Sequence, residues 1–293
     1  PARRPRVEGF WEYVGLKGVR AAIIHHDDLG MFRAQNDAFR SLPFPTGSIL
    51  APAAWVPDLV ENPKPGADLG VHLTLNSEWA HCRIRPLTCG PSLRDRQGYL
   101  FRTVEEAWRS VRAEEAEAEF RAQVELALGL GIDVTHVDTH MGSALRPDIA
   151  EAYLRVACSY RVLALVPDDV DHPMIPQPFR EPLRRLLGRV RLPRLKLAGL
   201  PYVQAGYDVR LRAFRDFLLN AEPGVYHVIH HACLRTGETR DLPDIDVREG
   251  DLRILSDPEV RKILEERWVL VTYRELRDAF RKYMGSEPWM AEG

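Results

Sequence analysis

Short apolar runs recur along the 293-residue chain and separate longer segments of mixed character. The runs are only a few residues long and mostly β-branched or aliphatic, which is typical of buried strands. They lie at 21–24, 48–51, 69–75, 132–137, 162–166, 225–229 and 269–271. Because helix-like segments lie between several of these runs, the pattern predicts an α/β fold with a mainly parallel sheet.

Three of the intervening segments carry helix start signals. Thr103, Ser256 and Thr272 are each followed three residues later by a glutamate, the spacing of a capping box. At this length the alternation favours a TIM-barrel-like (β/α) barrel, seven-stranded if every run is a strand. A doubly wound sheet is disfavoured because no glycine-rich phosphate loop follows the first run.

The same pattern suggests how the chain is organised. We expect residues 1–19 to form an N-terminal extension, 20–284 a single (β/α)-barrel domain and 285–293 a C-terminal tail. Two segments, 76–102 and 168–207, lack a clear period and are rich in Pro, Arg and Gly. We expect both to be long loops over the barrel mouth, where such folds hold substrate.

Polar side chains interrupt the apolar runs in a regular way. In "ADLGVHLTLN" strict alternation places His72 on the face opposite the leucines. The same rule gathers ionisable side chains on one face of two further strands, and the first strand ends in two aspartates. These residues are Asp27 and Asp28, then His136, Asp138 and His140, then His227 and His231. In parallel strands all of them lie towards the carboxyl ends, which is the catalytic rim of a barrel.

One carboxylate and two imidazoles are a ligand set for a divalent metal that keeps positions open for water or substrate. A metal in such a site lowers the pKa of bound water towards about 7. A second carboxylate then serves as a base and a further histidine as an acid. No Gly-x-Ser-x-Gly motif supports a serine nucleophile.

Composition narrows the class of protein. The net charge of −2 disfavours a general nucleic-acid binder, and no apolar run is long enough for a membrane span. The first residues lack the apolar core of a signal peptide, and the four cysteines lack metal-ligand spacing. We therefore expect a cytoplasmic protein, and the sequence leaves open whether it forms a homodimer.

Four ordered segments resemble a known family. "IIHHDDLG" resembles the "ADDFG" opening of YdjC-like (ChbG-type) carbohydrate deacetylases. "LGVHLTLN" looks like that family's "G-h-H-h-x-L-T" strand, where h is an apolar residue. "THVDTHMG" is similar to their "THxDSHHH" segment, and "GVYHVIHHA" to the strand that ends in His-Pro-Gly. The resemblance covers roughly residues 20–284 and implies a barrel of the polysaccharide-deacetylase-like kind.

The resemblance also implies roles for single residues. Asp27 corresponds to the general base and His231 to the general acid, while Asp28, His72 and His140 correspond to the metal ligands. The implied reaction is hydrolysis of the linear amide C–N bond of an N-acetyl group on an amino sugar or short chito-oligosaccharide, with metal-bound water as nucleophile. We expect one divalent ion, Zn²⁺ first, with Mg²⁺, Co²⁺, Ni²⁺ or Mn²⁺ as alternatives.

Further residues are expected to orient ligands or touch the sugar. They are His26, Trp79, His136, Asp138 and His227. A tryptophan ring can stack on a sugar, although packing is its commoner fate. The basic segment 184–196 could bind an anionic group, although a solvated helix face is the simpler interpretation.

The chain departs from the family pattern at several positions. His25 and His26 stand where the family has Asn-Ala, Met141 and Gly142 where it has further histidines, and Ala232-Cys233 replaces Pro-Gly. These differences leave the natural substrate open. The alternatives are a metal-dependent amidohydrolase acting on a non-sugar substrate and a catalytically silent relative that binds carbohydrate.

Overall fold

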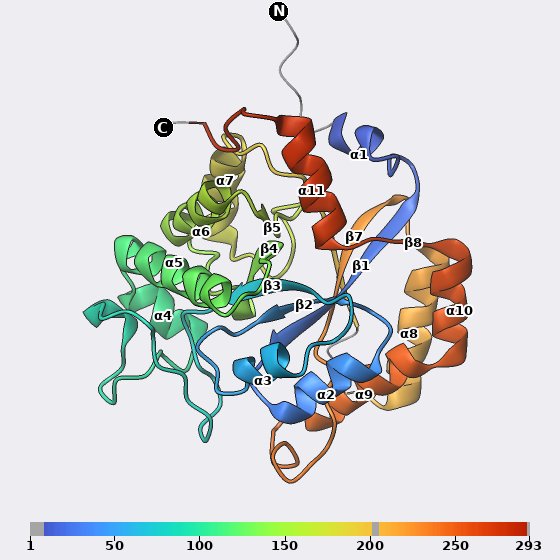
Figure 1. The fold of residues 1–293 in the computed structure, drawn as a ribbon, viewed down its shortest axis with the longest axis horizontal. Coiled ribbons are helices and arrows are strands. Elements are labelled where there is room, and N and C mark those ends of the chain that lie inside the picture. The colour runs from blue at the N-terminus through green and yellow to red at the C-terminus, as the bar shows by residue number, and fades with distance from the viewer. Residues whose placement is uncertain (1–8, 201–204, 292–293) are drawn as a thin grey trace, which may run out of the picture.

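A curled parallel sheet organises the chain, for which a computed structural model describes residues 9–200 and 205–291 (Figure 1). Neighbouring strands follow the order β5-β4-β3-β2-β1-β7-β6, and β8 pairs with β1. Every strand pair is parallel. The strands are β1 (Arg20–Leu29), β2 (Thr46–Ile49), β3 (Asp68–Leu73), β4 (His136–Thr139), β5 (Leu163–Ala164), β6 (Lys196–Gly199), β7 (Gly224–His230) and β8 (Val269–Leu270).

The two ends of this strand order also meet. An isolated parallel bridge joins Pro167, just after β5, to Leu195, just before β6. Leu195 N–H donates to the Val166 carbonyl at 2.9 Å, and Asp168 N–H donates to the Leu195 carbonyl at 3.0 Å. The sheet is therefore a TIM-barrel-like ring of seven strands, with β8 as an eighth strand beside β1. This confirms the predicted fold class.

One member of the ring differs from the prediction. β6 lies inside 168–207, which the sequence pattern marked as a loop, and the same segment holds α7 (Gln177–Leu187). The predicted strand at 269–271 forms β8, which pairs with Ala21 and Ala22 of β1. These residues precede His25, where the pairing of β1 with β2 begins. β6 is only four residues long and carries Lys196 and Gly199, so it lacks the apolar pattern of a buried strand.

Helices cover the outside of the ring. In Figure 1, α5, α6 and α7 lie on one side, and α8 and α10 lie on the other. The helices other than α7 are α1 (Phe10–Tyr13), α2 (Arg33–Ser41), α3 (Val56–Glu61), α4 (Val104–Ser110), α5 (Ala113–Gly129), α6 (Pro147–Tyr160), α8 (Tyr207–Asn220), α9 (Ile245–Ser256), α10 (Pro258–Arg267) and α11 (Tyr273–Met284). No helix among the described residues is long and apolar enough to cross a bilayer.

Two of the three predicted helix starts are confirmed as capping boxes. Thr103 opens α4 and Thr272 opens α11, each with reciprocal bonds to the glutamate three residues later. The third prediction is displaced by one residue, because Asp257, not Ser256, caps α10 by accepting from two backbone N–H groups. The helical segment after Thr103 also breaks into α4 and α5 at Val111 and Arg112, where the backbone is extended.

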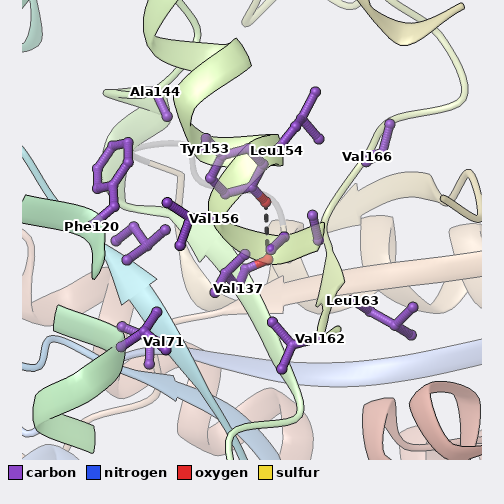
Figure 2. Close-up of a cluster of buried hydrophobic side chains, with 14 of the residues drawn as sticks. Val71, Phe120, Val137, Ala144, Tyr153, Leu154, Val156, Val162, Leu163 and Val166 are labelled. Atoms are coloured by element: carbon purple, nitrogen blue, oxygen red, sulfur yellow. Dashed lines mark hydrogen bonds between the residues drawn. The ribbon is translucent and has the colours of Figure 1, made fainter. Parts of the chain in front are cut away.

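The core between β4, β5 and α6 shows how helices are held on the sheet (Figure 2). Tyr153 of α6 is buried, and its hydroxyl donates to the backbone carbonyls of Val137 and Leu165. Apolar side chains including Val71, Phe120 and Val156 fill the space around it. This contact fixes the height of α6 against β4, the strand that ends at the polar cluster described next.

Candidate functional site

The polar cluster forms where the carboxyl ends of β1, β3, β4 and β7 converge. In the β1–β7 register His26 lies beside His230, and in the β3–β4 register His72 lies beside Asp138. Gly70 permits the close approach of β3 and β4, because a Cβ there would lie 2.5 Å from the His136 carbonyl oxygen. The predicted rim of ionisable side chains is therefore assembled by the sheet itself.

The end of β1 departs from regular strand geometry at Asp28. Its φ is +63°, in the left-handed region that non-glycine residues rarely occupy. Regular alternation would send Asp27 and Asp28 to opposite faces. The left-handed turn instead brings both carboxylates into the cluster, and strain of this kind is typical of functional sites.

Asp28, His72 and His140 form one group that fits a divalent metal. Asp28 Oδ1 lies 2.9 Å from His140 Nδ1 and 3.3 Å from His72 Nε2. All three side chains are buried, one ligand atom of each lies within 4.8 Å of the others, and Asp28 Oδ1 lacks a well-aligned hydrogen bond. Carboxylate oxygen and imidazole nitrogen are donors that Zn²⁺ and related ions accept.

Each imidazole of this group is held by a carboxylate on its other nitrogen. His140 Nε2 is hydrogen-bonded to Glu78 Oε2 at 2.9 Å, and His72 Nδ1 lies 2.9 Å from Asp138 Oδ1 in an ion-pair contact that is not aligned as a hydrogen bond. A carboxylate at one nitrogen keeps the proton there and leaves a lone pair on the other nitrogen. With a metal bound, His72 Nε2 and His140 Nδ1 would therefore be the nitrogens that offer lone pairs beside Asp28.

The electrostatic setting favours a cation. Burial lowers the pKa of His140, but Glu78 and Asp28 outweigh it and raise that pKa to about 9. Burial raises the pKa of Asp28, but His140, His72 and Arg248 hold it well below the ordinary value. Arg248 Nη1 donates to Asp28 Oδ2 at 3.0 Å, so only Oδ1 faces the imidazoles.

Asp27 faces the same space from a different side. Its Oδ2 lies 3.8 Å from His72 Nε2 and 3.8 Å from His231 Nε2. Burial raises the pKa of Asp27, but the neighbouring His72 and the hydrogen bond with His25 lower it below the ordinary value. Asp27 is therefore a carboxylate between the candidate ligands and His231.

His231 is the most accessible member, with 24 % of its side chain exposed. Its backbone N–H donates to Asp251 Oδ2 at 2.8 Å, and Asp251 forms a buried ion pair with Arg210 of α8. His231 is thus anchored through its backbone, and its ring lies at the accessible edge of the cluster.

Three further predicted residues lie in the polar cluster or directly behind it. Asp138 and His136 sit in the cluster: Asp138 also accepts from Ser48, and the His136 ring stacks on Tyr273 at 3.8 Å. His227 lies behind them, fully buried, with Nδ1 2.8 Å from the Tyr273 hydroxyl.

Two predicted residues lie outside the cluster's polar contacts. His26 is buried, and its Nε2 lies 2.8 Å from the Ala232 carbonyl, which it contacts instead of the carboxylates. Trp79 is only 7 % exposed, and its ring packs against Phe32 and lies 6.1 Å from the ring of His140. Trp79 therefore presents little surface for stacking on a sugar.

Several contacts of the site were not found from the sequence. Glu78, Arg248 and Asp251 each touch a predicted site residue. Glu78 follows β3 by a few residues, so its position in the loop after the His72 strand was a usable signal. Arg248 and Asp251 lie on α9, where nothing in the local pattern separates them from solvated charges.

A cavity of about 740 Å³ adjoins the cluster. Glu78 and Met141 line it next to His140, and Arg102, Trp108 and Met174 line it farther out. This volume lies in the range of sites for small organic ligands. The segment 76–102, predicted to form a loop at the barrel mouth, supplies part of this wall.

Comparisons with known proteins show which proteins the chain is similar to. A protein named carbohydrate deacetylase from Thermus thermophilus is 45% identical over 271 residues, covering 92% of this chain and 98% of the relative. One of the same name from Brevibacillus brevis is 27% identical over 226 residues, covering 72% of this chain and 79% of the relative.

A solved structure shares the fold. A protein from Enterococcus faecalis V583, described as a candidate cellobiose-phosphate cleavage protein, superposes with a TM-score of 0.71 at 19% identity, covering 88% of this chain and 99% of its own. The family model described as YdjC-like protein matches residues 21–266. The chain belongs to the YdjC-like family.

Proposed function

We propose that this protein is a metal-dependent hydrolase that removes the N-acetyl group from an amino sugar or short chito-oligosaccharide. The observation that carries the proposal is the convergence of Asp28, His72 and His140, with a carboxylate behind each imidazole. The printed name of the Thermus thermophilus relative, carbohydrate deacetylase, supports the reaction. Residues 20–284 are the proposed catalytic domain.

Asp28 Oδ1, His72 Nε2 and His140 Nδ1 are the proposed ligand atoms. A divalent ion at this position supplies Lewis-acid polarisation of the amide carbonyl and makes water easier to deprotonate. We place Zn²⁺ first because two of the three donors are imidazoles, with Mg²⁺, Co²⁺, Ni²⁺ and Mn²⁺ as alternatives.

Asp27 is the proposed general base. Its Oδ2 faces both the ligand side and His231, whereas its Oδ1 is engaged by His25 at 2.7 Å. Oδ2 takes a proton from the attacking water as the water oxygen forms a bond to the acetyl carbon. The lowered pKa of Asp27 keeps this carboxylate ionised and ready to accept that proton.

His231 is the proposed general acid. When the C–N bond breaks, His231 Nε2 gives a proton to the departing nitrogen, and the products are acetate and the free amine. The bond from its backbone N–H to Asp251 anchors His231, and its partly exposed ring lies 3.8 Å from Asp27 Oδ2, at the accessible edge of the cluster.

Metal content and acetate release test these assignments together. Wild type, Asp27→Asn, Asp28→Asn and the control Asp216→Asn are purified without an affinity tag and loaded with Zn²⁺. Asp216 is an exposed aspartate on α8 and serves as the matched control. Each protein is assayed by elemental analysis and with N-acetylglucosamine and its short oligomers.

We expect one metal per chain in wild type, Asp27→Asn and Asp216→Asn. Acetate release should fall about 10²–10⁴-fold in Asp27→Asn, the range for loss of a general base. Asp28→Asn should lose both metal and activity. Metal without acetate from any sugar would favour an amidohydrolase with a non-sugar substrate, and no metal under any loading condition would favour a silent carbohydrate-binding relative.

A further inference from the structure

His25 lies directly behind Asp27, on the side away from the proposed ligands. It is fully buried, and its Nδ1 is 2.7 Å from Asp27 Oδ1. Its Nε2 is 2.7 Å from His136 Nε2, and the His227 ring packs on it with centroids 4.3 Å apart. Both ring nitrogens are therefore engaged, and the ring cannot rotate without losing two buried contacts.

The direction of the proton in this contact follows from its partners. An ionised carboxylate only accepts hydrogen bonds, so the proton between the two groups is carried on His25 Nδ1. The contact between His25 Nε2 and His136 Nε2 holds one further proton. His136 Nδ1 in turn contacts the Thr135 hydroxyl at 2.9 Å. Whether His25 or His136 carries that further proton, His25 Nδ1–H still donates to Asp27.

The contact also determines which oxygen of Asp27 is available. Oδ1 is held by His25, and Gln35 donates to the Asp27 backbone carbonyl at 3.1 Å. Oδ2 is left facing His72 and His231, at 3.8 Å from each. Without His25, the carboxylate could turn about its χ2 torsion, whose wells are broad.

We propose that His25 is a positioning residue for the general base: it holds Asp27 Oδ1 so that Oδ2 is directed at the reacting water. This inference rests on the proposed function. His136 and Thr135 continue the chain of contacts and hold His25 in turn. His25 acts through Asp27 and does not touch the substrate.

Two replacements of His25, by Asn and by Leu, test the inference, because these two side chains have similar size but differ in the ability to donate a hydrogen bond. The side-chain amide of Asn can occupy the place of Nδ1 and donate to Asp27, whereas Leu has the same shape and cannot donate. We expect kcat for acetate release to fall about 10²-fold in His25→Leu, the scale for a misplaced catalytic group. KM and metal content should stay within about twofold of wild type, and His25→Asn should recover most of kcat.

Equal kcat values in the two variants would overturn the inference, because the donor would then be irrelevant. Elemental analysis gives a second criterion. His25, Asp27, Asp138 and His227 also place ligand atoms within 4.8 Å of one another. Two metals per chain in wild type, with one lost in His25→Leu, would mean that a metal and not a proton joins His25 to Asp27.

NMR provides a readout that is independent of activity. In metal-free wild type with ¹⁵N-labelled histidine, we expect a strongly deshielded N–H proton correlated with His25 Nδ1, absent in His25→Asn and shifted in Asp27→Asn. Its absence from wild type would overturn the inference even if acetate is released. Its presence without acetate release would retain the contact and reject only the deacetylase assignment.

Discussion

Asp138→Asn tests how much the buried carboxylate behind His72 contributes to metal binding. Asp138 Oδ1 lies 2.9 Å from His72 Nδ1, and Ser48 donates to Oδ2 at 3.1 Å. Burial raises the pKa of Asp138, but His72 outweighs it and holds that pKa well below the ordinary value, so the group is ionised. The amide of Asn has the same shape and can keep both contacts, so the substitution removes mainly the charge.

The expected loss of affinity is about 10–100-fold, the usual effect of removing an outer partner of a metal-bound imidazole, or about 1.4–2.7 kcal/mol. Glu78→Gln is the matched control, since Glu78 holds His140 at the same 2.9 Å. The Glu78 side chain is 22% exposed, whereas that of Asp138 is 2% exposed. Because water screens the more exposed charge, Glu78→Gln should weaken binding less.

Competition with a chelator of known Zn²⁺ affinity measures both variants against wild type, and urea unfolding of the metal-free proteins checks that each is folded. An affinity for Asp138→Asn within twofold of wild type would refute the reasoning. A larger loss in Glu78→Gln than in Asp138→Asn would also refute it, because burial would then not set the order.

Three further predictions concern stability. Arg210→Met should cost about 3–5 kcal/mol in urea unfolding because it leaves the buried Asp251 unpaired, and adding Asp251→Asn should recover part of that loss; equal stabilities for the two variants would contradict this. Burial lowers the pKa of His26 to about 3 from an ordinary 6.5, so the unfolded chain binds the extra proton and stability falls as pH drops below 6.5. His26→Gln should reduce that slope by about 1.36 kcal/mol per pH unit in metal-free protein between pH 6 and 4.5, and an unchanged slope would show that His26 is not buried neutral. Tyr153→Phe should cost only about 1 kcal/mol, because the Val137 carbonyl keeps its bond from the Leu165 backbone N–H and the Leu165 carbonyl is only partly buried; a cost above about 3 kcal/mol would assign the hydroxyl a larger role.

The parts of the fold that could be predicted are those with a strong local period. Seven apolar runs indicated a parallel barrel, and the strand alternation around His72 and His136 placed their side chains on the inner face. β6 was missed because its four residues carry no such period. Its pairing with β7 comes from the geometry of ring closure, which depends on the whole sheet.

The candidate site divides in the same way. The spacing of Asp27, Asp28, His72 and His140 after strands was enough to predict that they meet at one rim. Their partners were beyond reach, because Glu78 lies in an irregular loop and Arg248 on an outer helix. Local sequence does not record which loop or helix folds over the mouth of the barrel.

The sequence by itself determined which chemical groups stand at the ends of the strands, since alternation and strand order follow from short-range pattern. Only the tertiary structure decided how those groups are aimed. The left-handed backbone at Asp28 turns two adjacent carboxylates into one space, and His25, Asp138 and Arg248 each hold a different oxygen or nitrogen of the site. Such contacts join residues as far apart as 28 and 248, and they exist only after the strands have packed into a ring.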